Sequence, residues 1–201
     1  LRLQLQGLQR AGDDAARAAA IERLSAGIER ATRLVEQLLT LARQEASTAV
    51  NDPVDLRATA QLALADVAPA AQARSMDVGL LDSDAATVTG NAEALRMLAR
   101  NLLDNAIKYS PPGGQVDLQV RREGDHAVLT VEDSGPGIAP EHRERAMQRF
   151  VRVTADGAPG SGLGLAIVQA IAQGHGATVV LDSSPRLGGL RVAVRFAAAK
   201  P

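Results

Sequence analysis

The segment NLLDNAIKYSPPGG (residues 101–114) places two asparagines four residues apart on a leucine-rich helix and follows them with a lysine and a tyrosine. Asparagine is a poor helix former because its side chain competes for backbone hydrogen bonds. At about 100° per residue, Asn101, Asn105 and Lys108 fall on one stripe, with Tyr109 beside it. The adjoining stripe, which faces the core, consists of Leu98, Leu102 and Ala106. The polar stripe therefore lies at the edge of the buried face, where a ligand pocket can form, although a solvated helix face also fits the pattern.

These side chains suit a phosphorylated ligand. The amide oxygen of an asparagine is a hard ligand of the kind that Mg²⁺ accepts together with water and phosphate oxygens. Lys108 can neutralise phosphate charge, and Tyr109 can cover a base or a ribose.

The composition excludes several other classes of site. The 201 residues are 46% hydrophobic and 22% charged, with two Phe, one Tyr and no Trp. So few aromatic residues argue against a base-stacking nucleic-acid platform, and a net charge of −1 gives no basic footprint for DNA or RNA. Without cysteine there is no disulfide, thiol nucleophile or thiolate metal site. We therefore expect no nucleic-acid partner.

The start of the chain suggests a piece of a longer protein. The sequence begins with Leu rather than Met and enters helical periodicity at once. No signal peptide is visible. The longest nearly apolar run, residues 162–172, is far shorter than the ~20 residues of a membrane span.

The first 47 residues predict a helical hairpin. Residues 1–10 resemble the end of a helix, and AGDD at 11–14 breaks it. From residue 15 to 45, apolar residues recur at spacings of three and four, which predicts a long amphipathic helix with a bundle seam. Such a stripe needs a partner, most simply a second copy of the chain. Residues 48–53 (TAVNDP) end in proline and predict a linker.

After this linker the pattern changes to mixed α and β, in a domain expected at 54–198. Helices are predicted at 56–73, 92–109 and 163–173. Strands are predicted at 76–81, 86–89, 115–122, 126–132, 178–182 and 189–196. Because strands and helices segregate instead of alternating in βαβ units, we expect an α+β fold, a two-layer α/β sandwich.

Two glycine-containing motifs add to the helix of residues 92–109. In VEDSGPGI (131–138), an apolar strand delivers Asp133 to a turn whose Gly135 and Gly137 let a ligand approach the backbone. An adenine amino group would be a natural donor to this carboxylate, although an ordinary Asp-Ser-Gly turn also fits. In GAPGSGLGLAIV (157–168), three alternate glycines open an apolar helix whose free N–H groups can bind an anion. This second motif matches neither a dinucleotide-binding fingerprint nor a P-loop.

The segment between these motifs, residues 139–159, predicts a lid or a loop without order of its own. Arg149 and Arg152 flank Phe150. A closing lid could bring their guanidinium groups to phosphate, with Phe150 as its anchor; two solvated arginines are the alternative.

In this order the motifs resemble the catalytic domain of bacterial two-component sensor histidine kinases, members of the GHKL superfamily with the Bergerat-type ATP-binding fold. NLLDNAIKYSPPGG is similar to the N box, VEDSGPGI to the G1 box, QRFVRV (148–153) to the F box and GSGLGLAIV (160–168) to the G2 box. The two helices before them resemble part of the family's dimerisation and phosphotransfer hairpin.

The resemblance implies a role for each matching residue and two cofactors, ATP and Mg²⁺. Asn105 would ligate the metal, with Asn101 on the triphosphate side, Lys108 on phosphate and Tyr109 packed on the nucleotide. Asp133 would bind the adenine amino group. The remaining expected contacts are Gly135, Gly137, Arg149, Arg152, Gly162, Leu163 and Gly164.

The chain departs from the family pattern at two places. The phosphoacceptor histidine, which the family carries in a His-Glu-Leu-Arg-Thr-Pro-like motif, is absent, so we expect it upstream of Leu1 and expect this chain alone not to autophosphorylate. His126, His142 and His175 look like surface or turn residues. The F box reads Gln148 to Arg152 where an acidic-Arg-Phe-Tyr-Arg pattern is usual.

The implied function is that of a cytoplasmic kinase core whose parent protein is anchored in the bacterial inner membrane. The first implied partner is a second copy of the chain, which would associate through residues 1–47. This association should be weakened because part of the first helix is missing. The second implied partner is the receiver domain of a response regulator. Two alternatives stay open: a non-catalytic nucleotide-sensing dimerisation module, and a GHKL ATPase that would use Asp104, just before Asn105, as its carboxylate.

Overall fold

The computed structural model describes Ile21, residues 52–151 and residues 162–198. Apart from Ile21, the helical hairpin expected at 1–47 lies outside the described residues, as do positions 48–51 of the expected linker. Among the described residues, no helix combines the length and the apolar character that a bilayer crossing requires.

Three long helices and seven strands form the described domain. The helices are α3 (Leu56–Ala73), α4 (Ala92–Tyr109) and α6 (Gly164–Gly174), with a short 3₁₀ turn η1 (Pro140–His142) leading into α5 (Arg143–Ala146). The strands are β1 (Asp52–Asp55), β2 (Asp77–Leu80), β3 (Thr87–Gly90), β4 (Gln115–Glu123), β5 (His126–Asp133), β6 (Thr178–Ser183) and β7 (Leu190–Ala197).

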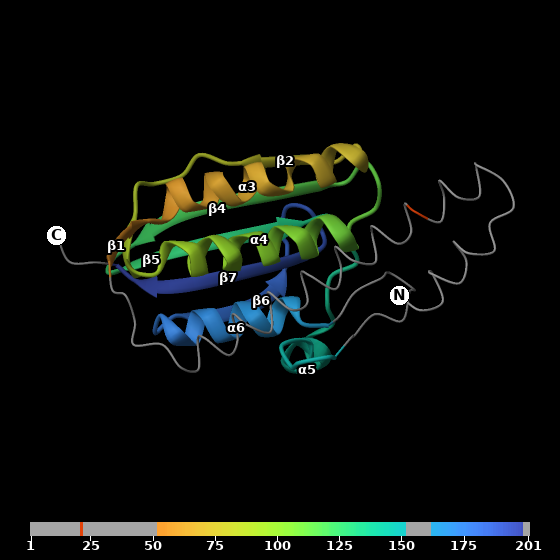
Figure 1. Cartoon of the computed structure of the whole chain (residues 1–201). Coiled ribbons are helices and arrows are strands. Elements are labelled where there is room, and N and C mark those ends of the chain that lie inside the picture. Colours follow the sequence, from red (N-terminus) through yellow and green to blue (C-terminus); the bar gives the residue numbers. More distant parts are fainter. Residues whose placement is uncertain (1–20, 22–51, 152–161, 199–201) are drawn as a thin grey trace, which may run out of the picture. The chain divides into compact units, whose positions relative to one another are not determined.

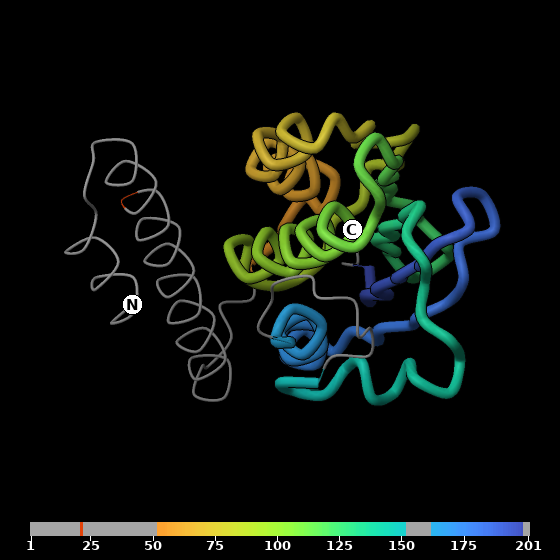
Figure 2. Tube along the Cα trace, turned by 90° about the vertical axis from the view of Figure 1, so that its right-hand side faces the viewer, coloured from red at the N-terminus to blue at the C-terminus, as the bar shows by residue number. Residues whose placement is uncertain are grey.

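A five-stranded sheet in the order β2-β4-β5-β7-β6 forms one layer, and α3, α4 and α6 form the other (Figures 1 and 2). β2 pairs with β4 in parallel, and every other neighbouring pair in this sheet is antiparallel. The two-layer α+β sandwich expected from the sequence is confirmed. Both α3 and α4 begin and end at the predicted residues.

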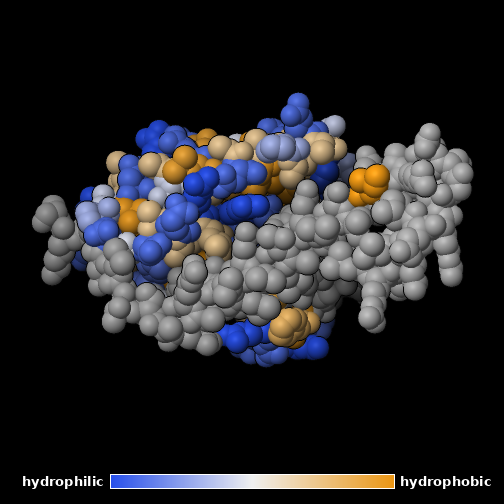
Figure 3. Space-filling model, in the orientation of Figure 1, coloured by the Kyte–Doolittle hydropathy of each residue, from blue (hydrophilic) through white to orange (hydrophobic). Residues whose placement is uncertain are grey.

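Alternation along the strands places the core between the two layers. Val116, Leu118 and Val120 of β4 are fully buried. In the register with β5, Leu118 stands opposite Val131 and Val120 opposite Leu129, whereas Val116 stands opposite Asp133. Successive side chains of a strand point to opposite faces, so the residues between them form the outer face of the sheet. The helices add alanine and leucine from their inner sides, and Figure 3 shows hydrophilic and hydrophobic residues mixed over the outer sides of α3 and α4.

A second, two-stranded sheet joins β1 to β3. Its register pairs Asp52 with Gly90 and Pro53 with Thr89. Residues 52 and 53, expected at the end of a linker, therefore belong to a strand. Proline is compatible with this position because β1 lies at the edge of a short sheet and one backbone N–H can stay outside the ladder.

Side chains fix the starts of α3 and α4 and hold the two helices together. Asp55 Oδ1 accepts the Ala58 N–H at 3.1 Å, and Asn91 Oδ1 accepts the Ala94 N–H at 2.9 Å. Such N-caps typically contribute about 1 kcal/mol each. Arg96 then donates to both carboxylate oxygens of Asp66, at 2.8 and 2.6 Å, which lowers the pKa of Asp66 and ties α4 to α3.

His175 lies in the turn after α6, as expected from the sequence, and its side chain is half-buried. The ring ties the end of α6 to the start of α4. Its Nε2 accepts the Asn91 N–H at 3.1 Å, so Nδ1 carries the proton and donates to the Ile171 carbonyl at 2.7 Å. Gly90 leaves room for the ring, since a Cβ there would lie 2.3 Å from His175 Cδ2.

Replacing Gly90 by alanine should therefore destabilise the domain by about 1–3 kcal/mol, the usual cost of overpacking. The ring cannot move aside without losing both of its hydrogen bonds. Gly79→Ala in β2 is the matched control, because a Cβ at Gly79 meets nothing within 4 Å. Urea unfolding followed by circular dichroism measures both variants, and equal midpoints would contradict the packing argument.

Candidate nucleotide-binding site

Asp133, the last residue of β5, carries its carboxylate into the space between sheet and helices. The residue is 6% exposed. Its Oδ1 accepts two backbone N–H groups, from Gly135 at 2.9 Å and from Leu190 at 3.1 Å. No hydrogen bond from the described residues reaches Oδ2, which therefore remains able to accept one from a ligand.

Burial raises the pKa of Asp133, and the N–H groups of Leu190 and Gly135 oppose this shift. A buried carboxylate without a cation beside it is costly for a fold. Carboxylates with a perturbed pKa in a partly enclosed place are typical of functional sites, although structural networks also produce them.

Glycines line the surroundings of Asp133 because the backbone passes too close for side chains. A Cβ on Gly135 would lie 3.0 Å from the Tyr109 carbonyl oxygen, which places the turn after β5 against the end of α4. Gly137 has a φ of +70°, a conformation that favours glycine. A Cβ on Gly189 would lie 2.3 Å from both the backbone oxygen and Oδ1 of Asp133.

The polar stripe of α4 divides into inner and outer members. Asn101 is only 8% exposed, and its Nδ2 donates to the Met97 carbonyl at 2.8 Å. Asn105 is half-buried. Near the end of the helix, Lys108 Nζ donates to the Tyr109 hydroxyl at 2.9 Å and lies 4.4 Å from the centre of its ring.

Asn105 meets the first residue of α6. A Cβ on Gly164 would lie 2.7 Å from Nδ2 and 2.9 Å from Oδ1 of Asn105, so glycine is required where the two helices approach. No side chain caps the N-terminus of α6, and Leu163 before it is fully buried. The amide of Asn105 therefore lies beside uncapped N–H groups at the positive end of a helix dipole, an arrangement that suits an anion and its metal.

The structure describes residues 139–151 of the predicted lid, together with Gly162 just after it. Phe150 donates its N–H to the Gly162 carbonyl at 3.0 Å. Gly162 has a φ of +69°, and a Cβ on it would lie 2.9 Å from the Phe150 carbonyl carbon. The F-box-like and G2-box-like segments are thus joined. The Phe150 side chain is 66% exposed, so the expected anchoring by its ring is not formed. Arg149 is exposed, and Arg152 lies outside the described residues.

The start of this segment is fastened to the sheet. Arg143 donates to Asp182 Oδ1 and to Ser183 Oγ, both at 3.0 Å, and to the Ile138 carbonyl at 3.2 Å. A closing movement of a lid would therefore have to begin after α5, later than the predicted start at residue 139.

The structure brings two groups of predicted residues together. Asp133, Gly135 and Gly137 form one group beside the end of α4, and Asn105 meets Gly164 at the start of α6. Sequence reasoning missed the contribution of β7, where Gly189 packs on Asp133 and Leu190 donates its N–H. The Gly-Gly pair at 188–189 could have indicated a close approach of the backbone. The N–H donor of Leu190 could not have been found in this way, because any residue except proline can provide one.

The fold and these motifs agree with comparisons to known proteins. Residues 90–200 match the model of the family described as histidine kinase-, DNA gyrase B-, and HSP90-like ATPase. Sensor protein QseC from Salmonella typhi is 42% identical over 200 residues, covering 98% of this chain and 43% of that relative. The chain thus spans less than half the length of this curated relative.

Solved structures give the same result. A mycobacterial sensor histidine kinase MprB is similar with a TM-score of 0.66 and 32% identity, covering 76% of this chain and 100% of that structure. The cytoplasmic segment of histidine kinase QseC is similar with a TM-score of 0.57 and 33% identity, covering 86% and 95%. The chain therefore belongs to the family of histidine kinase-, DNA gyrase B- and HSP90-like ATPases, and its catalytic ATP-binding domain is of the kind found in sensor histidine kinases.

Proposed function

We propose that this domain binds ATP together with Mg²⁺ and that the protein to which it belongs transfers the γ-phosphate to a histidine outside these 201 residues. The observation that carries the proposal is the contact of Asn105 with Gly164 at the uncapped start of α6. This contact supports the proposal because the Asn105 amide, which could ligate Mg²⁺, lies beside the helix end that would hold the triphosphate.

The base end of the nucleotide would lie at Asp133. Its Oδ1 is held by two backbone N–H groups, so Oδ2 would accept the adenine amino group. Gly135 and Gly137 would form the wall beside the ring, and Tyr109 would pack on the nucleotide. Lys108 would leave its contact with Tyr109 to reach phosphate, and Asn101 would support the triphosphate side of the helix.

The described residues suit Mg²⁺ only if the nucleotide supplies most of its ligands. Among the described residues, no group of three or more His, Cys, Asp or Glu could hold a metal ion. Magnesium commonly keeps several waters and takes few protein ligands plus substrate phosphates. One amide oxygen from Asn105 is therefore sufficient, and the ion would polarise the transferred phosphoryl group.

The chain's part in the transfer would be positioning and charge neutralisation. The phosphoacceptor is expected upstream of Leu1. His175 does not fit the role because both of its ring nitrogens form hydrogen bonds. The other two histidines are exposed residues, His126 at the start of β5 and His142 in η1. Arg149, Arg152, Gly162, Leu163 and Gly164 are proposed on the phosphate side.

The setting of the domain is proposed from its relatives. We infer a cytoplasmic domain of a protein anchored in the inner membrane, a homodimer through residues 1–47 and a response-regulator receiver domain as acceptor of the phosphate. A net charge of −1 favours protein partners over nucleic acid.

Phosphate transfer from γ-labelled ATP·Mg²⁺ tests the proposal. We expect no label on this chain and acid-labile, alkali-stable label on a version extended upstream through the preceding helix. Asn105→Ala in the extended version should lose the label, because the metal and triphosphate lose their amide ligand. ATP binding by both versions with no label on either would favour the nucleotide-sensing module. ATP hydrolysis by this chain that Asp104→Ala abolishes would favour a GHKL ATPase.

Asp133→Asn should separate binding from folding. The N–H groups of Gly135 and Leu190 would select the amide oxygen, which places the amide nitrogen where Oδ2 faces the adenine amino group. Two donors would then oppose each other, so ATP affinity should fall about tenfold or more. Isothermal titration with ATP measures this loss, and unchanged affinity would remove Asp133 from the site.

Without nucleotide, the Asp133→Asn variant should become more stable than the wild-type chain as the pH rises. Burial raises the pKa of Asp133, so the folded chain holds this proton more tightly than the unfolded chain. Wild-type stability therefore falls relative to Asp133→Asn from about pH 3.9, the ordinary aspartate value, up through the raised pKa. Urea midpoints of both proteins across this window measure the difference, and parallel profiles would contradict the burial argument.

A further inference from the structure

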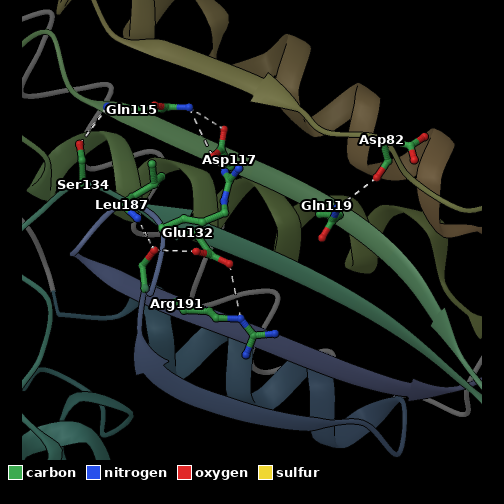
Figure 4. Close-up of polar contacts among 10 residues, drawn as sticks. Asp82, Gln115, Asp117, Gln119, Glu132, Ser134, Leu187 and Arg191 are labelled. Atoms are coloured by element: carbon green, nitrogen blue, oxygen red, sulfur yellow. Dashed lines mark hydrogen bonds and ion pairs between the residues drawn. The ribbon is translucent and has the colours of Figure 1, made fainter.

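The two acidic residues at the end of β5 face opposite sides of the sheet. Asp133 points toward the helices, and Glu132 points to the outer face, where its Oε1 lies 3.5 Å from Arg191 Nε (Figure 4). The loop from Ser184 to Gly189, here called the β6–β7 loop, passes around this strand end. It therefore has access to both carboxylates.

Ser184 fastens the β6–β7 loop to Glu132. The residue is 4% exposed, and its hydroxyl donates to Glu132 Oε2 at 2.6 Å while accepting the Leu187 N–H at 3.0 Å. The hydroxyl therefore both donates and accepts a hydrogen bond. A hydrogen bond to a carboxylate is among the stronger ones in a protein.

From Ser184 a continuous series of hydrogen bonds leads to Asp133. The Ser184 N–H donates to the Gly189 carbonyl at 2.7 Å, and the Gly189 N–H donates to the Asp133 carbonyl at 3.1 Å. The next residue, Leu190, donates its N–H to Asp133 Oδ1 at 3.1 Å. Glu132, on the outer face, is thereby connected through the loop to the carboxylate on the inner face.

The contact between the loop and Asp133 is tight. A Cβ on Gly189 would lie 2.6 Å from the Gly135 nitrogen as well as 2.3 Å from Asp133 Oδ1. A displacement of the loop would therefore move Leu190, the residue that follows it, and change the packing against Gly135. A second attachment, the ion pair of Arg186 with the buried Asp117 on β4, holds the loop on the outer face.

We propose that Ser184, through its hydrogen bond to Glu132, is a positioning residue for adenine recognition: it holds the β6–β7 loop so that the Leu190 N–H fixes the orientation of the Asp133 carboxylate. The adenine part of this proposal rests on the proposed function. The positioning of Leu190 does not, since it concerns the nucleotide-free chain.

Ser184→Ala and Ser83→Ala form a matched pair for the test. Ser83 is likewise a buried serine, 6% exposed, whose hydroxyl donates to the Leu81 carbonyl at 2.7 Å and accepts the Val120 N–H at 3.1 Å. It belongs to the segment after β2, on the far side of β4 from β5 in the strand order. Each variant thus loses a buried hydroxyl that donates one hydrogen bond and accepts another, and only Ser184 connects to Asp133.

Amide hydrogen exchange of the nucleotide-free full chain gives the first readout. The Leu190 amide should exchange about tenfold faster in Ser184→Ala than in Ser83→Ala, the change expected for loss of a hydrogen bond to a charged group. Glu132→Ala should have the same effect, and the double variant should add little, because both substitutions break one connection. Equal exchange in Ser184→Ala and Ser83→Ala would overturn the proposal.

Ligand binding gives the second readout. Affinity for ATP should fall about tenfold in Ser184→Ala, whereas affinity for inorganic tripolyphosphate, which lacks the base, should stay within twofold. Equal losses for both ligands would overturn the proposal, because they indicate general loosening of the domain. If the wild-type chain bound no ATP, the proposed function would fail, and the exchange comparison alone would decide the positioning of Leu190.

Discussion

A carboxylate buried at the end of a central strand is the constraint on which the rest of the site depends. Asp133 is nearly inaccessible to solvent, and two backbone N–H groups satisfy one of its oxygens. Those donors can approach only where side chains are absent, which accounts for Gly135 and Gly189 on either side of it. The turn after β5 and the start of β7 are therefore shaped by the needs of one side chain. Its second oxygen is the one proposed to bind the adenine amino group.

A parallel constraint acts on the helical layer. α4 and α6 are joined at both ends, by Asn105 against Gly164 at one and by His175 against Asn91 at the other. Each contact depends on a glycine that lets the partner approach, Gly164 in the first case and Gly90 in the second. Because the helices are fixed at two points, the amide of Asn105 has a defined position relative to the start of α6. Precise placement of this kind is the main contribution that a protein makes to phosphoryl transfer.

The sequence predicted the elements of the fold better than their assembly. The ends of α3 and α4 could be predicted because capping residues and apolar periodicity are local signals. The parallel pairing of β2 with β4 and the β1–β3 sheet could not, since strands of four residues carry little pattern and pair with distant partners. Of the candidate site, Asp133, Asn105 and Gly164 could be proposed from residue type and spacing. The Leu190 N–H and the partner of Ser184 could not, because a backbone donor has no residue type and their contacts span more than fifty residues.

The two ends of the proposed nucleotide site differ in how they are built. The proposed base end consists of adjacent strands of one sheet, where Leu190 of β7 donates to Asp133 of β5, and of the β6–β7 loop, which is attached to the outer face of that sheet. The phosphate end is formed by a helix terminus and by the Phe150–Gly162 contact, with the exposed Arg149 beside it. Strand ladders restrict movement more than single contacts between segments do. A nucleotide bound by its base at the rigid end would have its phosphates at the end where the chain can rearrange around them. This difference suits the proposed transfer of a phosphoryl group to a residue outside the domain.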